Sequence, residues 1–349
     1  MKRASAVAAL ALMVGALGPA SAQSNANPST SLRTSPIDAL ILAAITAPST
    51  VSYTGTVQSF RIGNGASEAA VYRVEHRAPD LTLRVYTAPS DLSGYSVVLK
   101  GDQSYAIDSK KRRIVESRDD AVDARMALLS DDALMHKNYR AVVRGSEIFD
   151  RRRAIDVAIL SKDTSRAAML LRIDDATKIV LDKQEFGPEG ALVSELRFEN
   201  IDFASSIPAA DFAIPKGYGV VRGPTFGETF DRPDRVVHAA GFATREPRSL
   251  PGGFVPIEGD LDDMQGVRTV HFLYCDGIRT VSLFESAQAS TLEVTQLRPR
   301  SLRVGRRDAE YAEDGTTALL AWSDGSLYYT LVGEVGLVDL PPLAASITP

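Results

Sequence analysis

Residues 70–107, AVYRVEHRAPDLTLRVYTAPSDLSGYSVVLKGDQSYAI, decide the fold of this chain. Runs rich in β-branched and aromatic residues occupy 70–75, 81–86, 95–99 and 104–107, and Gly, Pro, Asp or Ser separate them. Short runs of this kind, bounded by turn residues, predict β-strands. Because the connections are too short for helical crossovers, we expect an antiparallel sheet.

The same pattern begins at Tyr53 and returns in four later runs, 154–161, 167–173, 178–186 and 192–201. One predicted helix precedes this pattern and a second interrupts it. Ser35 and Pro36 are a plausible N-cap and first helical residue for a short helix that is apolar nearly all round and therefore buried.

The second helical pattern, at 119–139, has one apolar face. The first domain, residues 35–216, is therefore predicted to be one large curved sheet. Its helices cover only part of the concave face and leave a hydrophobic hollow.

A second domain is predicted after residues 217–249, which are rich in Gly, Pro and charge and are typical of a linker. Residues 250–349 contain two similar units, each with Asp-Gly, at 276–277 and 324–325, between two apolar runs. Asp-Gly in this context favours a β-hairpin. The sequence thus predicts an α+β protein: a large curved antiparallel sheet, then a smaller antiparallel β domain closed by an apolar tail that forms a terminal helix.

The first 22 residues predict a cleavable secretory signal peptide. Lys2 and Arg3 precede the uncharged apolar run 4–17, and small residues at 20–22 form a cleavage site. That run is too short to span a bilayer of roughly 30 Å as a helix, which disfavours a membrane anchor. We therefore expect a mature protein in the periplasm with no membrane span.

Residues 23–34 are Ser, Asn, Thr and Pro with almost no apolar content, and they predict a disordered leader. Position 23 is Gln, so no cysteine is available there for lipid attachment. The mature protein is therefore expected to be unlipidated.

The charge balance argues against nucleic acid as a partner. Removal of Lys2 and Arg3 leaves 37 basic residues from 39 against 44 acidic residues, a net charge of −7, whereas phosphate binding needs a basic field. Two short basic clusters, 110–113 and 151–153, are either solvated turns or docking sites for an acidic partner.

No catalytic or metal-binding constellation stands out. The four histidines, 76, 136, 238 and 271, do not have metal-ligand spacing. Cys275 is the only cysteine and, flanked by apolar residues, is expected to be a small buried residue. We therefore predict no metal, no cofactor and no catalytic residue, and a binding or sensing role, with an unmarked hydrolase as the alternative.

Several short phrases, in this order, carry a resemblance to a known family. They are VSYTGT at 51–56, KGD at 100–102, LLRID at 170–174 with FEN at 198–200, LPGGF at 250–254, LYCDG at 273–277 and VGEV at 332–335. The chain resembles the RseB/MucB family of periplasmic regulators of the envelope-stress sigma factor, over most of its mature length.

The resemblance implies a first domain similar to the lipoprotein carriers LolA and LolB, an open half-barrel with a helical lid. It also implies a second domain that helps to hold the periplasmic segment of a membrane-bound anti-sigma factor. Binding in that family shields the segment from proteolysis, and lipid or lipopolysaccharide fragments relieve the shielding. Stoichiometric occlusion of this kind requires no catalytic residue.

Period-two alternation identifies candidate lipid-binding residues for the hollow, with two more from the helical lid. They are Val74, Leu83, Val85, Val97, Leu99, Tyr105 and Ile107, with Met126 and Leu129 as the lid. A fully packed core is the alternative. The corresponding alternative function is a periplasmic lipid or lipoprotein carrier that uses this hollow alone.

Overall fold

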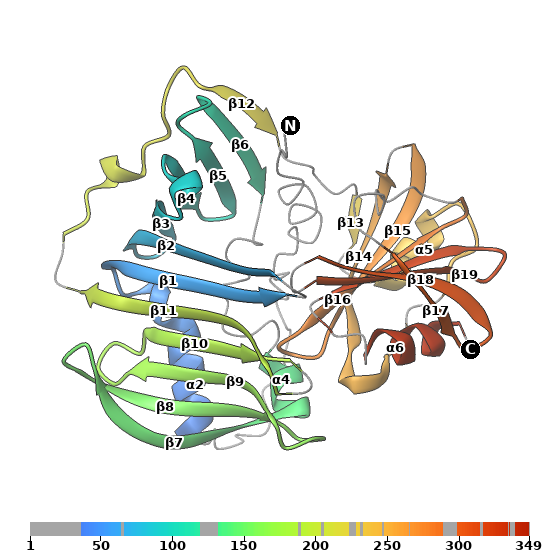
Figure 1. The fold of residues 1–349 in the computed structure, drawn as a ribbon, viewed down its shortest axis with the longest axis horizontal. Helices are drawn as coiled ribbons and strands as arrows, with labels where there is room; N and C mark the ends of the chain where they lie inside the picture. The colour runs from blue at the N-terminus through green and yellow to red at the C-terminus, as the bar shows by residue number, and fades with distance from the viewer. Residues whose placement is uncertain are drawn as a thin grey trace.

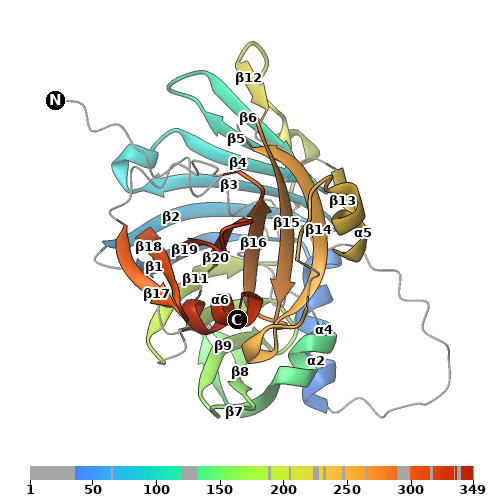
Figure 2. The same cartoon turned by 90° about the vertical axis from the view of Figure 1, so that its right-hand side faces the viewer.

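The computed structural model describes residues 36–348 except 64–65, 119–131, 188–189, 204–205, 223–227, 231–232, 246–247, 265, 289–298, 315–316, 334 and 336–338. Two β-sheets dominate it, one of twelve strands and one of eight, and they lie side by side (Figure 1). The larger sheet is strongly curved and its concave face turns toward the smaller one (Figure 2).

The strand order of the large sheet is β12-β6-β5-β4-β3-β2-β1-β11-β10-β9-β8-β7. The described pairs are antiparallel except β12 with β6, which is parallel. The strands are β1 (Tyr53–Gly63), β2 (Ala66–Arg77), β3 (Leu81–Ala88), β4 (Tyr95–Lys100), β5 (Gln103–Asp108), β6 (Arg113–Arg118), β7 (Tyr139–Phe149), β8 (Arg152–Ser161), β9 (Ala167–Asp174), β10 (Val180–Phe186), β11 (Leu192–Asp202) and β12 (Gly219–Arg222).

Helix α2 (Pro36–Thr46) and helix α4 (Asp132–Asn138) pack on the concave face. Ile41 of α2 and Met135 of α4 are fully buried against Ile159 and Leu171 of the sheet. Each side chain of this size contributes about 1.5–3 kcal/mol when it is removed from water. This cluster, the helix-side core, fixes one half of the sheet.

The convex face of β3 to β6 is covered by the segment that leaves β11 and contains the short helix η3 (Ala209–Phe212). Phe212 and Ile207 of this segment pack with Val98, Ile107 and Ile114. The segment then continues to β12, which joins the edge of the same sheet.

The small sheet has the order β13-β14-β15-β16-β20-β19-β18-β17. One face packs under helices α5 and α6 in a large apolar core that contains Phe272, Tyr311, Trp322 and Leu331. Its elements are β13 (Glu228–Phe230), α5 (Pro233–Ala239), β14 (Val255–Met264), β15 (Val267–Cys275), β16 (Thr280–Ser286), β17 (Arg300–Val304), β18 (Arg307–Asp314), β19 (Thr317–Ser323), β20 (Tyr328–Gly333) and α6 (Leu340–Ile347), with short helices η1 (Ala47–Ser49), η2 (Ser90–Leu92) and η4 (Pro251–Gly253) elsewhere in the chain.

The predicted fold class is confirmed: a large curved antiparallel sheet, open rather than closed into a barrel, followed by a smaller antiparallel β domain with a terminal helix. The two Asp-Gly dipeptides lie between β15 and β16 and between β19 and β20, as the hairpin signal predicts. Cys275 is buried, as expected.

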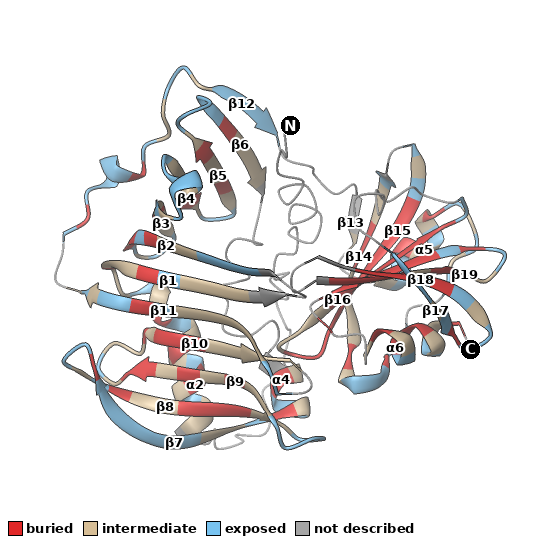
Figure 3. Cartoon of the chain, in the orientation of Figure 1, coloured by how far each residue is buried: buried red, intermediate tan, exposed pale blue. Residues whose placement is uncertain are grey.

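Other parts differ from the sequence expectation. Residues 217–249, predicted as a linker, contain β12, which extends the large sheet, and β13 and α5, which belong to the small one. Strand β7 has no predicted counterpart; it is an edge strand whose middle is exposed (Figure 3). Of the helix expected at 119–139, α4 covers 132–138, and residues 119–131 lie outside the described residues.

Candidate functional site

A compact joint connects the two sheets where α4 runs into β7. Asn138 Nδ2 donates hydrogen bonds to two carbonyl oxygens of the small domain, Gly253 at 3.2 Å and Asp276 at 2.8 Å. The adjacent Tyr139 hydroxyl donates to Asp276 Oδ2 at 2.6 Å. Tyr139 and Asp276 are both buried, so this contact excludes water.

Asp276 is the centre of the joint. Its Oδ1 accepts from the backbone N–H groups of Ile278 and Arg279, at 3.0 and 2.7 Å, and its Oδ2 accepts from Arg279 Nε at 2.9 Å. Burial and the neighbouring carboxylate raise the pKa of Tyr139 far above its ordinary value, so the hydroxyl remains a donor. A buried carboxylate with four donors is an anchor that holds the β15–β16 turn to α4.

Two glycines allow this close approach. Gly277 has φ +108°, and a Cβ there would lie 2.3 Å from Met135 N. Gly253 has φ +84°, and a Cβ there would lie 2.5 Å from Asn138 Oδ1. Any L side chain at 277 would therefore clash with the α4 backbone as well as adopt a strained conformation.

The second Asp-Gly turn is anchored in the same manner. Asp324 Oδ2 accepts from Arg245 Nη2 at 2.6 Å and from the Tyr329 hydroxyl at 2.9 Å. The backbone N–H of Arg245 also donates to Glu285, at 2.9 Å. Burial raises the pKa of Glu285 to about 7. The chain around Arg245 is therefore fixed across the helix-covered side of the small sheet.

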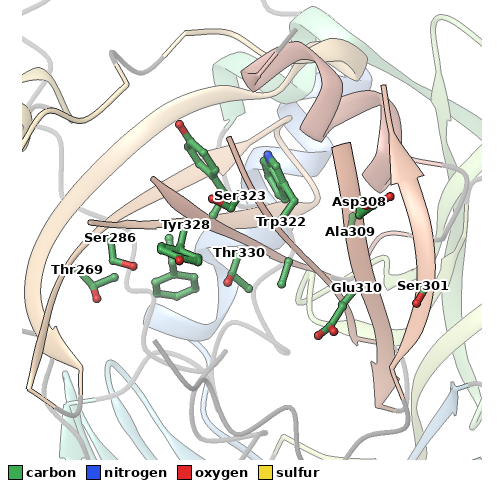
Figure 4. A pocket seen from close by; sticks show the side chains of 13 residues that line it. Thr269, Ser286, Ser301, Asp308, Ala309, Glu310, Trp322, Ser323, Tyr328 and Thr330 are labelled. Atoms are coloured by element: carbon green, nitrogen blue, oxygen red, sulfur yellow. The ribbon is translucent and has the colours of Figure 1, made fainter. Parts of the chain in front are cut away.

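A pocket of about 640 Å³ lies in the small sheet, and residues of six neighbouring strands line it (Figure 4). Its lining combines apolar side chains with hydroxyl groups and two exposed carboxylates, Asp308 and Glu310. Tyr328 is an aromatic residue with 43% exposure. The lining residues are Thr269, Phe284, Ser286, Ser301, Asp308, Ala309, Glu310, Ala321, Trp322, Ser323, Tyr328, Tyr329 and Thr330.

Strand register assigns Tyr328 and Glu310 to the face of the small sheet that α5 and α6 leave uncovered. Tyr328 is opposite Ser286 and Ser323, and Glu310 is opposite Ala321. Residues that are directly opposite in an antiparallel pair share a face. We call this face, with its pocket, the binding face of the small sheet.

The structure divides the predicted hollow residues between the two faces of the large sheet. Leu83 is opposite Val98, and Val98 is opposite Tyr105, whereas Val97 is opposite Arg84, which is opposite Val74. Leu83, Val85, Tyr105 and Ile107 therefore lie on the convex face. Of these, Leu83, Tyr105 and Ile107 pack in the core under η3.

Val74, Val97 and Leu99 lie on the concave face, where they are buried. The expectation that all seven strand residues share this face is thus wrong, because a one-residue difference in register exchanges the two faces. Met126 and Leu129, the predicted lid, lie outside the described residues.

Polar groups interrupt the concave face. Arg84, which is only 5% exposed, lies between Val74 and Val97. Further along, Lys183 forms an ion pair with Glu185 at 2.9 Å. Although burial opposes ionisation of Glu185, Lys183 and Ser194 hold its pKa below the ordinary value. The apolar patch around Val97 is therefore separate from the helix-side core.

Within the described ranges, no group of three or more His, Cys, Asp or Glu residues is placed to hold a metal ion. Nor does any helix in the described part of the chain have the length and apolar character needed to cross a membrane.

The comparisons with known proteins first show the fold, which this chain shares with solved structures of MucB. A Pseudomonas aeruginosa MucA/MucB complex aligns over 88% of this chain and 96% of that one, with 15% identity and a TM-score of 0.60. MucB in complex with MucA(peri) aligns over 89% and 98%, with 17% identity and a TM-score of 0.56. MucB alone aligns over 88% and 96%, with 15% identity and a TM-score of 0.51.

Residues 45–215 match the model of the MucB/RseB N-terminal domain. The chain belongs to the MucB/RseB family. None of the curated proteins compared matches it.

Proposed function

We propose that this protein is a periplasmic regulator that binds the periplasmic segment of a membrane-bound anti-sigma factor and shields it from proteolysis. The family supports this proposal, since solved structures of the same fold are complexes of MucB with MucA(peri). The predicted signal peptide, residues 1–22, supports a periplasmic location.

The single observation that carries the proposal is the pocket across six strands of the binding face. Strands lie about 4.8 Å apart, so six strands span roughly 24 Å, and an extended peptide rises about 3.3 Å per residue. The binding face thus accommodates a segment of about seven residues. Ser, Thr and carboxylate groups offer partners for its backbone and for its polar side chains, and Tyr328 offers an aromatic anchor.

The joint supports the same role. Because Tyr139, Asn138 and Asp276 fix the small domain to α4, the binding face is held beside the concave face of the large sheet (Figure 2). A preorganised site loses less free energy on binding than a mobile one.

A binding titration tests the proposal. The probe is the purified periplasmic segment of an anti-sigma factor from the same organism, and heat of binding is the readout. Tyr328→Ala should weaken binding about thirtyfold, as truncation of an interfacial aromatic anchor does. The control is Ile148→Ala, which removes a 71% exposed side chain from the edge strand β7 and should leave affinity unchanged. Equal affinities for both variants would exclude the binding face.

Lipid carriage is the second candidate function. A lipid that causes release of the bound partner would occupy the same site on the concave face. The concave patch of Val74, Val97 and Leu99 supports it, because these side chains converge on one face. Native mass spectrometry of protein purified without detergent should then show bound acyl chains. A mass equal to that of the polypeptide in every preparation would count against this candidate.

A further inference from the structure

One edge of the large sheet concentrates positive charge in a protein whose net charge is −5. The turn between β5 and β6, the first residue of β6 and residues 216–222 carry six exposed cationic side chains. Figure 1 shows β6 and β12 side by side at this edge of the sheet. We call this surface the basic tip; its cations are Lys110, Lys111, Arg112, Arg113, Lys216 and Arg222.

Specific contacts hold the two segments of the basic tip together. Arg112, in the left-handed region at φ 49°, donates from Nη2 to Gly217 O at 3.2 Å. Its guanidinium lies 5.2 Å from the centroid of the Tyr218 ring. The N–H of Gly219 donates back to Arg112 O at 2.9 Å. The cations from the two segments therefore share one fixed surface.

Acidic groups only partly neutralise this surface. Asp108 forms an ion pair with Lys111 at 3.1 Å, and Glu116 is opposite Arg222 in the β6–β12 register. In the part of the chain that the structure describes, these two carboxylates are paired with or opposite two of the six cations. A local excess of positive charge on an acidic protein attracts polyanions to that part of its surface.

Exposed apolar side chains adjoin the cations. Val220 and Val221 of β12 are 59% and 43% exposed. They are opposite Ile114 and Val115 in β6, and Gly219 is opposite Arg113, so the valines directly follow the basic turn. Among the described strands β12 is the last of its sheet, so no described strand lies beyond the edge that carries both valines.

Cations beside exposed apolar groups on a projecting edge match the interface of an anionic bilayer. Lys and Arg attract the headgroups, and small apolar side chains enter the boundary with the acyl chains. The pocket described above lies in the other sheet, and the features that the basic tip offers are charge and exposed apolar side chains. We propose that the basic tip docks this protein on the surface of an anionic phospholipid bilayer, with Val220 and Val221 at the interface.

Co-sedimentation with vesicles tests this proposal. Full-length mature protein is mixed with phosphatidylcholine vesicles that contain either no anionic lipid or about one-third phosphatidylglycerol. Only the anionic vesicles should bind the protein, and binding should weaken as salt is raised, because salt screens surface charge.

The variant Lys110→Gln with Lys111→Gln and Lys216→Gln removes three cations from the basic tip. Each basic residue near an anionic surface contributes about fivefold to partitioning, so this variant should bind roughly a hundredfold more weakly. The matched control removes Arg300, Arg303 and Arg306, three exposed cations at the β17–β18 hairpin, as Gln substitutions. It has the same net charge and should bind like the wild type.

Val220→Ser with Val221→Ser should weaken vesicle binding severalfold at constant charge. Circular dichroism and the urea midpoint, unchanged in every variant, show that each remains folded. Binding to uncharged vesicles as strong as to anionic ones would overturn the proposal. So would equal losses in the basic-tip variant and its control.

Discussion

The Tyr139→Phe variant tests the joint between the two sheets. This substitution removes one hydroxyl and keeps the ring, which is 4% exposed in the helix-side core. The lost hydrogen bond, at 2.6 Å, is donated to the buried Asp276 carboxylate. Hydrogen bonds to charged groups contribute about 1.5–3 kcal/mol.

Asp276 keeps its other donors, Arg279 Nε and two backbone N–H groups. We therefore expect a loss of about 2 kcal/mol in the free energy of unfolding, near the middle of the range for charge-assisted bonds. Urea unfolding measures it, with the fluorescence of Trp322 reporting on the small sheet and circular dichroism reporting on both sheets. Both probes should shift to a lower midpoint.

Tyr105→Phe is the matched control, because Tyr105 is partly buried on the convex face of the same domain. It should change the free energy of unfolding by less than about 0.5 kcal/mol. The account of the joint is wrong if Tyr139→Phe is as mild as this control, since the buried contact to Asp276 would then contribute nothing.

Three further substitutions have defined outcomes. Gly277→Ala should lower the free energy of unfolding by at least about 2 kcal/mol more than Gly325→Ala, since both glycines have positive φ but only a Cβ at 277 meets the backbone of Met135; equal calorimetric losses would contradict this. The pKa of Glu285 is raised to about 7 from 4.5, so the unfolded chain loses this proton at a lower pH than the folded protein does. The free energy of unfolding of the wild type should therefore fall by about 3 kcal/mol as pH rises from 4.5 to 7. Glu285→Gln should remove this pH dependence in urea titrations. Hydrogen bonds from Ser326 and Arg245 hold the pKa of Asp324 well below 3.8 despite its burial. The ionised carboxylate of Asp324 therefore stabilises the fold above pH 4. Asp324→Asn should lower the urea midpoint at pH 7 more than at pH 2, and equal losses at both would refute that role.

The sequence predicted the elements that local signals define. Asp276-Gly277 and Asp324-Gly325 marked both hairpins because few residues other than glycine adopt the backbone of such turns. The buried helix after Ser35 followed from its cap and its apolar composition. These signals lie within a few residues, so no knowledge of tertiary contacts was needed.

The same local signals could not assign the residues of the large sheet to its two faces. Val97, Val98 and Leu99 are all apolar and all buried, so period two gives no indication of which side chain points inward. Register decided it: Leu83 pairs with Val98 rather than with Val97. The sequence-derived hollow therefore combined residues from both faces.

The joint and β12 were missed for related reasons. The sequence identified Asp276 only as a turn residue, because its partners Asn138 and Tyr139 lie more than 130 positions away in the chain. Strand β12 has four residues and all of them are exposed, which leaves no periodic burial to detect. Edge strands and interdomain contacts carry little local signal, although both decide what surfaces the protein presents.

A protease-protection titration tests the central claim most directly. The purified periplasmic segment of an anti-sigma factor from the same organism is incubated with its initiating protease and increasing amounts of this protein. If the protein shields the segment stoichiometrically, the cleavage rate should fall in proportion to the protein added and reach a plateau at about one protein per segment. With the Tyr328→Ala variant in place of the wild type, the cleavage rate should be restored. A cleavage rate that is unchanged at every protein concentration would contradict the account.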